Sequence, residues 1–172
     1  MKRRLMVAVL IGAAMLGGCT KRATPGNVSE LTPGGGDPYG NDEQDPALKR
    51  LQADLAASAG SDRVFFAFDA HMLSAEARAT LTRQAQWLRQ HPQVAFSVEG
   101  HADERGTREY NLALGERRAR AAADFLILQG IAPSRITTLT YGKERPEVLG
   151  SDEASHAQNR RAVSVVILYN DR

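Results

Sequence analysis

Residues 94–129 read VAFSVEGHADERGTREYNLALGERRARAAADFLILQ, and this stretch decides the fold. From Val94 onward, apolar residues alternate with smaller or polar ones, which predicts a half-buried strand that stops at Gly100. A helical pattern then runs over about 107–129 and is closed by Gly130. The stretch therefore predicts a strand, a short polar loop and a long helix in direct succession.

The long helix carries two polar residues on its apolar side. At roughly 100° per residue, Asn111 and Arg118 fall in the middle of the apolar arc, whereas Arg117 and Arg120 point away from it. A guanidinium that faces a core is costly unless its charge is paired. Arg118 therefore needs a partner or a ligand, and the two alternatives are a ligand-binding group and a buried structural ion pair.

A candidate partner lies in the loop at 100–107, GHADERGT. Loops at the carboxyl ends of strands are the usual ligand sites of α/β sheets. An anion at Asp103 and a cation at Arg118 would form a site with two opposite charges. Such a site fits a zwitterion, because Asp103 can hold an ammonium group while Arg118 binds a carboxylate through two parallel hydrogen bonds.

The flanking sequence predicts the rest of the sheet. An apolar run at 64–68 predicts a buried strand, and Ser74 is a candidate N-cap for a helix that Pro92 ends. Two further strands are predicted at 136–141 and 163–169. This order predicts an α/β (α+β) sandwich, with one mixed sheet of about four strands and two main helices packed on it. The aromatic residues expected in its core are Phe65, Phe66, Phe96 and Phe125.

Residues 1–18 have the pattern of a signal peptide. Three basic residues precede an apolar run from Leu5 to Leu16, which is too short for the roughly 20 residues that a bilayer-spanning helix needs. The residues that follow, Gly17-Gly18-Cys19, resemble a lipobox, so Cys19 is the expected lipidation residue. The alternative is an ordinary secretory signal with a chance cysteine. Cys19 is the single cysteine and has no internal disulfide partner, which favours lipidation.

The charge balance gives no support to nucleic-acid binding. The whole chain has a formal net charge of +2. Without the three basic residues of the leader, the 22 basic residues fall to 19 against 20 acidic ones. A near-neutral mature chain lacks the basic footprint of a nucleic-acid-binding protein.

Residues 19–60 are expected to form the lipidated cysteine and a flexible tether, with the folded domain at 61–172. Glycine and proline recur between Thr20 and Asp45 among few aliphatic residues, so little can be buried there. About 40 residues of Gly-rich coil would span roughly 35 Å. Leu48, Leu51 and Leu55, three and four residues apart, predict a short amphipathic helix within this segment.

Several motifs in order resemble the OmpA-like peptidoglycan-binding domain. They lie within about 63–168 and are VEGHADERG at 98–106, EYNLALGERRA at 109–119, YGKERP at 141–146 and NRR at 159–161. In that family, the aspartate of the first motif and the second arginine of the helix motif clasp meso-diaminopimelate in the peptide stem of peptidoglycan. By position these residues are Asp103 and Arg118. The supporting site residues that the resemblance implies are Phe68, Asp69, Arg105, Asn111 and Leu114.

The resemblance also implies a biological setting. Lipoprotein members of the family bind peptidoglycan without a covalent bond, hold the outer membrane to the cell wall from the periplasmic side, and work in envelope integrity and cell division. They act with the Tol system, including the β-propeller protein TolB. Thr20 follows the cysteine where the inner-membrane retention signal is Asp, which implies sorting to the outer membrane. One departure is Ala102, where many members carry Thr, so a hydroxyl contact would be lost.

Two other function classes compete with this interpretation. His101, Asp103 and Glu104 could serve as metal ligands or as an acid/base pair of a hydrolase. The other histidines are scattered and no HExxH, Walker, GxSxG or CxxC motif occurs, so neither an enzyme nor a cofactor is expected. A pure protein-docking module is the second competitor. A stator or secretion component with the same domain would need a membrane-spanning helix or extra domains.

Overall fold

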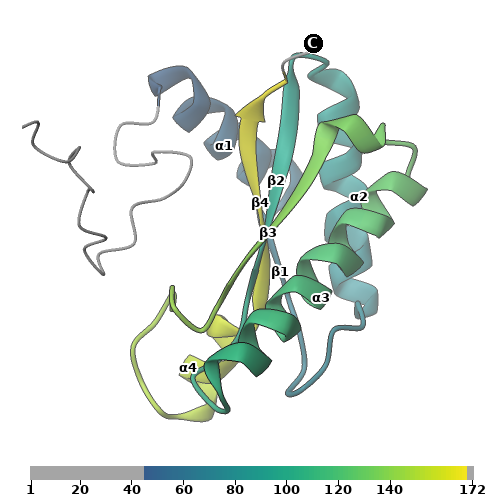
Figure 1. Cartoon of the computed structure of the whole chain (residues 1–172). Helices are drawn as coiled ribbons and strands as arrows, with labels where there is room; N and C mark the ends of the chain where they lie inside the picture. The colour runs from purple at the N-terminus through teal and green to yellow at the C-terminus, as the bar shows by residue number, and fades with distance from the viewer. Residues whose placement is uncertain (1–44, 170–172) are drawn as a thin grey trace, which may run out of the picture. The chain divides into compact units, whose positions relative to one another are not determined.

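The computed structural model describes residues 45–169. The expected signal peptide, the lipidation residue Cys19 and most of the expected tether lie outside the described residues. The elements are α1 Pro46–Ala59, β1 Arg63–Phe65, α2 Ala75–Gln90, β2 Val94–His101, α3 Arg108–Leu128, the 3-10 turn η2 Pro133–Arg135, β3 Ile136–Gly142, α4 Glu153–Asn159 and β4 Arg161–Leu168 (Figure 1). None of the helices between residues 45 and 169 is both long and apolar enough to cross a membrane.

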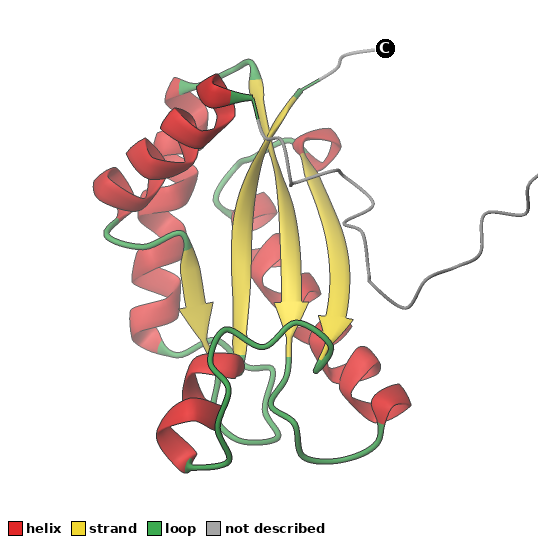
Figure 2. Cartoon of the chain, turned by 90° about the vertical axis from the view of Figure 1, so that its left-hand side faces the viewer, coloured by secondary structure: helices red, strands yellow, loops and turns green. Residues whose placement is uncertain are grey.

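The four strands form one mixed sheet in the order β1-β4-β2-β3. β4 is antiparallel to β1 and β2, and β3 is parallel to β2, so β1, β2 and β3 end at the same end of the sheet. α2 and α3 lie together on one face of the sheet (Figure 1). Among residues 45–169, no helix covers β2, β3 and β4 on the other face, while α4 and long loops lie at the end where β2 stops (Figure 2). This arrangement confirms the predicted fold class.

A close contact between two glycines places α3 directly on the sheet. A Cβ atom added to Gly100 at the end of β2 would lie 1.8 Å from the carbonyl oxygen of Gly115 on α3. A Cβ atom on Gly115 would lie 2.4 Å from Oγ1 of Thr140 on β3. Only glycine allows this approach, since any side chain would force the backbones apart. The contact fixes the first half of α3 beside the ends of β2 and β3.

Two strands differ from the sequence predictions. β2 was predicted to be half-buried, but all eight of its residues are buried, because β4 and β3 flank it on both sides. The strand predicted at 64–68 is shorter, since β1 ends at Phe65. Phe66 is buried, but the side chain of Phe65 is 49% exposed, because β1 is an edge strand. The placement of Phe65 in the core was therefore wrong.

The segment between β3 and β4, where the sequence patterns predict no helix or strand, contains α4. This helix spans only seven residues, Glu153–Asn159, and buries no apolar stripe, so hydrophobic periodicity gave no signal for it. Its N-terminus is capped by Asp152, whose Oδ1 accepts a hydrogen bond from the backbone N–H of Ser155 at 3.0 Å. The Asp152 cap was the local signal available in the sequence.

The short helix predicted within the tether is α1, and it packs on the folded domain. Leu55 and Ala59 of α1 are fully buried in the main core cluster. Trp87 on α2 donates from Nε1 to the carboxylate of Asp54 at 2.7 Å, and Nε of Arg83 donates to the Ala59 carbonyl at 2.7 Å. The folded domain therefore begins with α1, earlier than the expected boundary at residue 61.

The side chain of Gln52 takes the place of a missing strand residue. β1 pairs only with the first residues of β4, Arg161 to Val163. Farther along β4, the Gln52 amide donates to the Ser164 carbonyl at 3.0 Å and accepts from the Val166 N–H at 2.8 Å. A primary amide has the same donor and acceptor groups as a peptide bond. Gln52 thereby satisfies backbone groups that the short β1 leaves uncovered.

This arrangement predicts that α1 is required for full stability. A fragment of residues 61–172 should unfold at lower urea than a fragment of residues 45–172, because it loses the buried contacts of Leu55 and Ala59. Within the longer fragment, Gln52→Ala should lower the free energy of unfolding by about 1–3 kcal/mol, since two backbone groups of β4 lose their partner. Urea unfolding followed by circular dichroism measures both effects. Equal midpoints for the two fragments would show that α1 adds nothing to the fold.

Candidate ligand-binding site

A cavity of about 210 Å³ lies where β1 and β2 end and α3 begins. Its lining residues are Phe68, Asp69, Asp103, Arg105, Gly106, Tyr110, Asn111, Leu114 and Arg118. All seven residues predicted for ligand binding are among them, although they come from three separate segments. The structure thus brings these residues together around one cavity. Their roles toward a ligand stay a prediction.

Arg118 is fully buried beneath this cavity. Its guanidinium donates three hydrogen bonds to backbone carbonyls, from Nε to Ala70 at 2.9 Å, from Nη1 to His101 at 2.8 Å and from Nη2 to Ala67 at 3.3 Å. The guanidinium carbon also lies 5.3 Å from the centre of the Phe66 ring. Burial lowers the pKa of Arg118 to about 10, so the side chain remains protonated at neutral pH.

These contacts differ from the buried structural ion pair that was the alternative role for Arg118. Its bonded partners are three carbonyls, and Asp103 is not one of them. An arginine has five N–H groups, so three are used to join the loop after β1 to the end of β2. The other two have no bond within residues 45–169. The guanidinium can therefore serve the fold and still bind an anion in the cavity.

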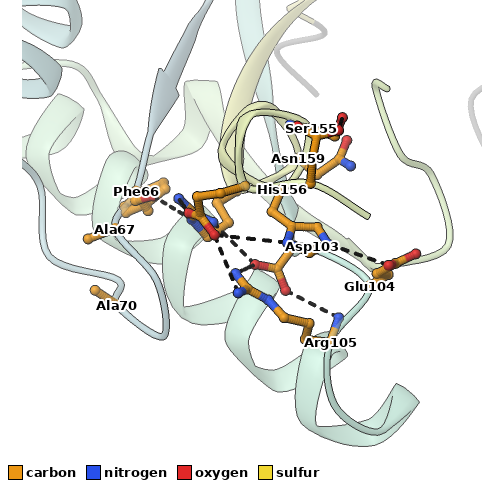
Figure 3. Close-up of polar contacts among 12 residues, drawn as sticks. Phe66, Ala67, Ala70, Asp103, Glu104, Arg105, Ser155, His156 and Asn159 are labelled. Atoms are coloured by element: carbon orange, nitrogen blue, oxygen red, sulfur yellow. Dashed lines mark hydrogen bonds and ion pairs between the residues drawn. The ribbon is translucent and has the colours of Figure 1, made fainter. Parts of the chain in front are cut away.

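Asp103 is 5% exposed and has two cationic partners. Its Oδ2 accepts from Nη2 of Arg105 at 2.6 Å, and its Oδ1 accepts from the backbone N–H of Arg105 at 3.2 Å (Figure 3). Its Oδ2 also accepts from Nη1 of Arg160 at 3.4 Å. Burial alone would raise the pKa of Asp103. The hydrogen bonds and charges of Arg105 and Arg160 outweigh burial and lower that pKa below its usual value.

Arg160 and Glu153 support Asp103 from behind. Arg160 donates from Nε to the Phe66 carbonyl at 3.1 Å and pairs with Glu153 at 2.8 Å. Glu153 also lies 3.4 Å from Nη1 of Arg105, which closes a ring of four alternating charges with Asp103. The next residue, Arg161, is buried and pairs with a glutamate of the loop between β3 and β4 at 3.3 Å. Both arginines of the NRR motif therefore have structural contacts.

The rim of the cavity combines aromatic rings and a second carboxylate. Asp69 has a left-handed backbone with φ of 52°, a conformation that is uncommon outside glycine. The Tyr110 hydroxyl donates to its carboxylate and holds it at the rim. Asn111 donates to the carbonyl of Arg105 at 2.9 Å, which explains a polar residue on the apolar side of α3. The Phe68 ring is 61% exposed and lies against the Arg105 guanidinium at 4.2 Å.

Ala102 does not line this cavity. It is buried and borders a separate pocket of about 140 Å³ together with Glu104 and Lys143. Its backbone N–H donates to the Gly142 carbonyl at 2.7 Å. The cavity of Asp103 and Arg118 is therefore formed without the side chain at position 102, and the expected loss of a hydroxyl contact stays a prediction.

Sequence reasoning missed four contributors to the site: Gly106, Tyr110, Glu153 and Arg160. Tyr110 precedes Asn111 and falls outside the apolar arc of α3, so the helical wheel gave no signal for it. Arg160 was visible in the NRR motif, but its contact with Asp103 spans 57 residues of sequence. Such a contact depends on how β4 enters the sheet.

His101 lies beside the site without lining the cavity. Its carbonyl accepts the hydrogen bond from Arg118, while its ring is buried and lies 5.5 Å from the Tyr141 ring. Burial and the positive charge of Arg161 lower the pKa of His101 to about 3, so the imidazole is neutral at pH 7. Within residues 45–169, no group of three or more His, Cys, Asp or Glu side chains is placed to hold a metal ion.

Comparisons with known proteins all point to the OmpA family and to its peptidoglycan-associated lipoproteins. The model of the OmpA family matches residues 65–160. A peptidoglycan-associated lipoprotein of Mesorhizobium japonicum is 45% identical over 164 residues, which cover 95% of this chain and 92% of that protein. One from Agrobacterium fabrum is 45% identical over 161 residues, covering 94% of this chain and 86% of that protein.

The fold is also similar to a solved structure. The crystal structure of the peptidoglycan-associated lipoprotein from Burkholderia pseudomallei superposes with a TM-score of 0.62 at 42% sequence identity. The match covers 66% of this chain and 100% of that chain. The matched part of the chain thus corresponds to a complete folded unit in that structure.

The buried imidazole of His101 predicts a pH dependence of stability. Its pKa is about 3 in the folded state and 6.5 ordinarily, so below pH 6.5 the unfolded chain binds a proton that the folded domain does not. Stability should therefore fall with acidification between about pH 6.5 and 3, by at most about 1.4 kcal/mol per pH unit from this residue. His101→Gln should flatten the decline between pH 6.5 and 4.5 in urea unfolding. Parallel curves for the two proteins would show that the imidazole does not titrate on unfolding.

Proposed function

The chain belongs to the OmpA family and, within it, to the peptidoglycan-associated lipoproteins, and we propose that its folded domain binds peptidoglycan non-covalently through the cavity of Asp103 and Arg118. The observation that carries the proposal is that a buried carboxylate and a buried guanidinium line the same cavity. Neither group is bonded to the other, so each can meet an opposite charge of one ligand.

The ligand that fits best is the zwitterionic end of meso-diaminopimelate in the peptide stem. Its ammonium group would approach Asp103, and its carboxylate would approach the two N–H groups of Arg118 that are not bonded to carbonyls. Leu114 lines the cavity and offers an apolar surface to the methylene chain of the ligand. The exposed Phe68 ring and the Asp69 carboxylate lie at the rim, where the rest of the stem would enter.

The proposed role is binding and not catalysis. A hydrolase would need His101 as a base near Asp103 and the ligand. Instead, the His101 ring lies against Tyr141 and does not line the cavity. The charged groups of the site are held in place by ion pairs and hydrogen bonds, which supports a role in recognition.

The family membership supports a location as well as a ligand. We propose that Cys19 carries the lipid anchor, that the anchor lies in the outer membrane, and that the domain faces the periplasm. The folded domain would then join the outer membrane to the cell wall. Because α1 packs on the domain, the connection between anchor and domain is shorter than the expected 19–60 segment.

Docking to the Tol system, including TolB, is the second proposed role, with envelope integrity and cell division as its outcome. Large apolar side chains are exposed on loops at the end of the sheet that carries the cavity. They are Phe68 at 61%, Met72 at 78% and Leu149 at 88%. Exposed apolar side chains are common in protein contact surfaces, although Leu128 at 78% and Leu168 at 54% are exposed outside these loops as well.

The diaminopimelate proposal predicts that Asp103→Asn and Arg118→Lys each weaken binding to purified peptidoglycan by at least about tenfold. Each change removes a charge-assisted contact of roughly 1.5–3 kcal/mol. Both substitutions keep the shape or the charge of the original residue, because Arg118→Ala would strand three carbonyls and unfold part of the domain. Co-sedimentation with peptidoglycan measures binding, and thermal melting is recorded on the same samples.

Two exposed residues of α3 provide matched controls. Arg117→Lys and Asp124→Asn make the same chemical changes outside the cavity and should leave binding unaltered. Normal binding by Asp103→Asn, or loss of binding only in variants that have unfolded, would reject the two-charge site.

The anchor proposal predicts that Cys19→Ser releases the protein from the outer membrane. The folded domain should melt at the same temperature, since Cys19 precedes all of the described elements. Fractionation of cells followed by detection of the chain tests the location. Unchanged recovery with the outer membrane would show that something other than Cys19 holds the protein there.

A further inference from the structure

The carboxylate of Asp103 already has a cation in the position that a ligand ammonium would take. Arg105 Nη2 lies 2.6 Å from Oδ2 of Asp103, and both residues line the cavity. Asp103 is too deeply buried to accept another cation beside both arginines, because its side chain is only 6% exposed. A ligand ammonium and the Arg105 guanidinium therefore compete for the same carboxylate.

Of the two arginines that contact Asp103, only Arg105 is free to move. Arg160 is 8% exposed and is fixed by the Phe66 carbonyl at 3.1 Å and by Glu153 at 2.8 Å. The Arg105 side chain is 38% exposed. Its Nε is buried and has no hydrogen-bond partner within the described residues, so its position on Asp103 leaves one donor unsatisfied.

The backbone of Arg105 is held independently of its side chain. Its N–H donates to Asp103 Oδ1 at 3.2 Å, and its carbonyl accepts from Asn111 at 2.9 Å. The guanidinium can therefore leave Asp103 without a change in the loop. A second acceptor is within reach, because Glu153 lies 3.4 Å from Nη1 of Arg105 and is 64% exposed.

We propose that Arg105 is a displaceable stand-in for the ligand ammonium, so that binding exchanges one cation for another at Asp103 while Arg105 swings toward Glu153. The inference rests on the proposed function of the cavity and adds a specificity-determining residue to it. The exchange keeps the charge of Asp103 balanced. A ligand with an acylated amine brings no cation and cannot replace Arg105, which selects for a free ammonium group beside a carboxylate.

Removing the charge of Arg105 should strengthen ligand binding, whereas removing a residue that contacts the ligand directly should weaken it. If Arg105 competes with the ligand, Arg105→Gln should tighten binding of the full chain to purified peptidoglycan by about two- to fivefold, the usual strength of a partly exposed ion pair. Arg105→Lys keeps a competing cation and should tighten binding less than Arg105→Gln does. Arg108→Gln is the matched control, since Arg108 is 62% exposed, forms a surface ion pair with Glu144 at 3.2 Å and does not line the cavity.

The decisive measurement is the same substitution in an Asp103→Asn background, with full-length protein in detergent and purified peptidoglycan as the probe. Asp103→Asn alone should weaken binding, and adding Arg105→Gln should then change affinity by less than about twofold, because no ion pair remains to be broken. Free meso-diaminopimelate, titrated without peptidoglycan, should bind the Arg105→Gln protein more tightly than the original protein by the same factor. Melting temperatures identify any variant that has lost its fold.

The outcomes separate this inference from the function on which it rests. Weaker binding by Arg105→Gln, or an equal gain in both backgrounds, would overturn the exchange and leave the role of Asp103 intact. Normal binding by Asp103→Asn would overturn the proposed clasp itself, and the exchange with it. Tighter binding by Arg105→Gln that depends on the Asp103 charge supports both.

Discussion

The fold and the site both depend on one buried guanidinium. Arg118 donates to Ala67 and Ala70 in the loop after β1 and to His101 at the end of β2, so three chain segments meet at one side chain. A buried cation is tolerated only when its donors are satisfied. Carbonyls and not a carboxylate accept the hydrogen bonds of Arg118. An anion in the cavity can therefore bind its guanidinium without displacing a bonded carboxylate.

The position of Arg118 follows in turn from backbone packing. The contact between Gly100 and Gly115 brings α3 against the end of β2, closer than any side chain would permit. Arg118 lies one turn of helix beyond Gly115, and Asn111 lies one turn before it, so both reach the loops at the end of the sheet. The glycines Gly100 and Gly115 thus let α3 approach the sheet closely. This close approach lets Asn111 and Arg118 contact the loops.

Charges around Asp103 combine structural and functional duties. Arg160 and Glu153 hold the carboxylate from behind and bring α4 to the site, while Arg105 covers it from the cavity side. This arrangement keeps Asp103 ionised despite its burial, which a site for an ammonium group requires. The exposed partner is also the one whose charge a ligand can replace. The ion pairs of Asp103 therefore both stabilise its buried charge and compete with the ligand.

The sequence by itself determined the strand, loop and helix at 94–129, the sheet class and the five cavity residues that lie in the family motifs, because periodicity and short motifs are local. Phe68 and Asp69 lie outside those motifs and were expected only from the resemblance to the family. It did not determine that α1 belongs to the domain, since three leucines at helical spacing do not show what they pack against. Gln52 bonds to β4 across 112 residues, and Arg160 reaches Asp103 across 57. Only the tertiary structure decided the exposure of Phe65, the full burial of β2 and the partners of Arg118. Burial and charge pairing depend on which segments lie side by side, and these segments are far apart in the chain.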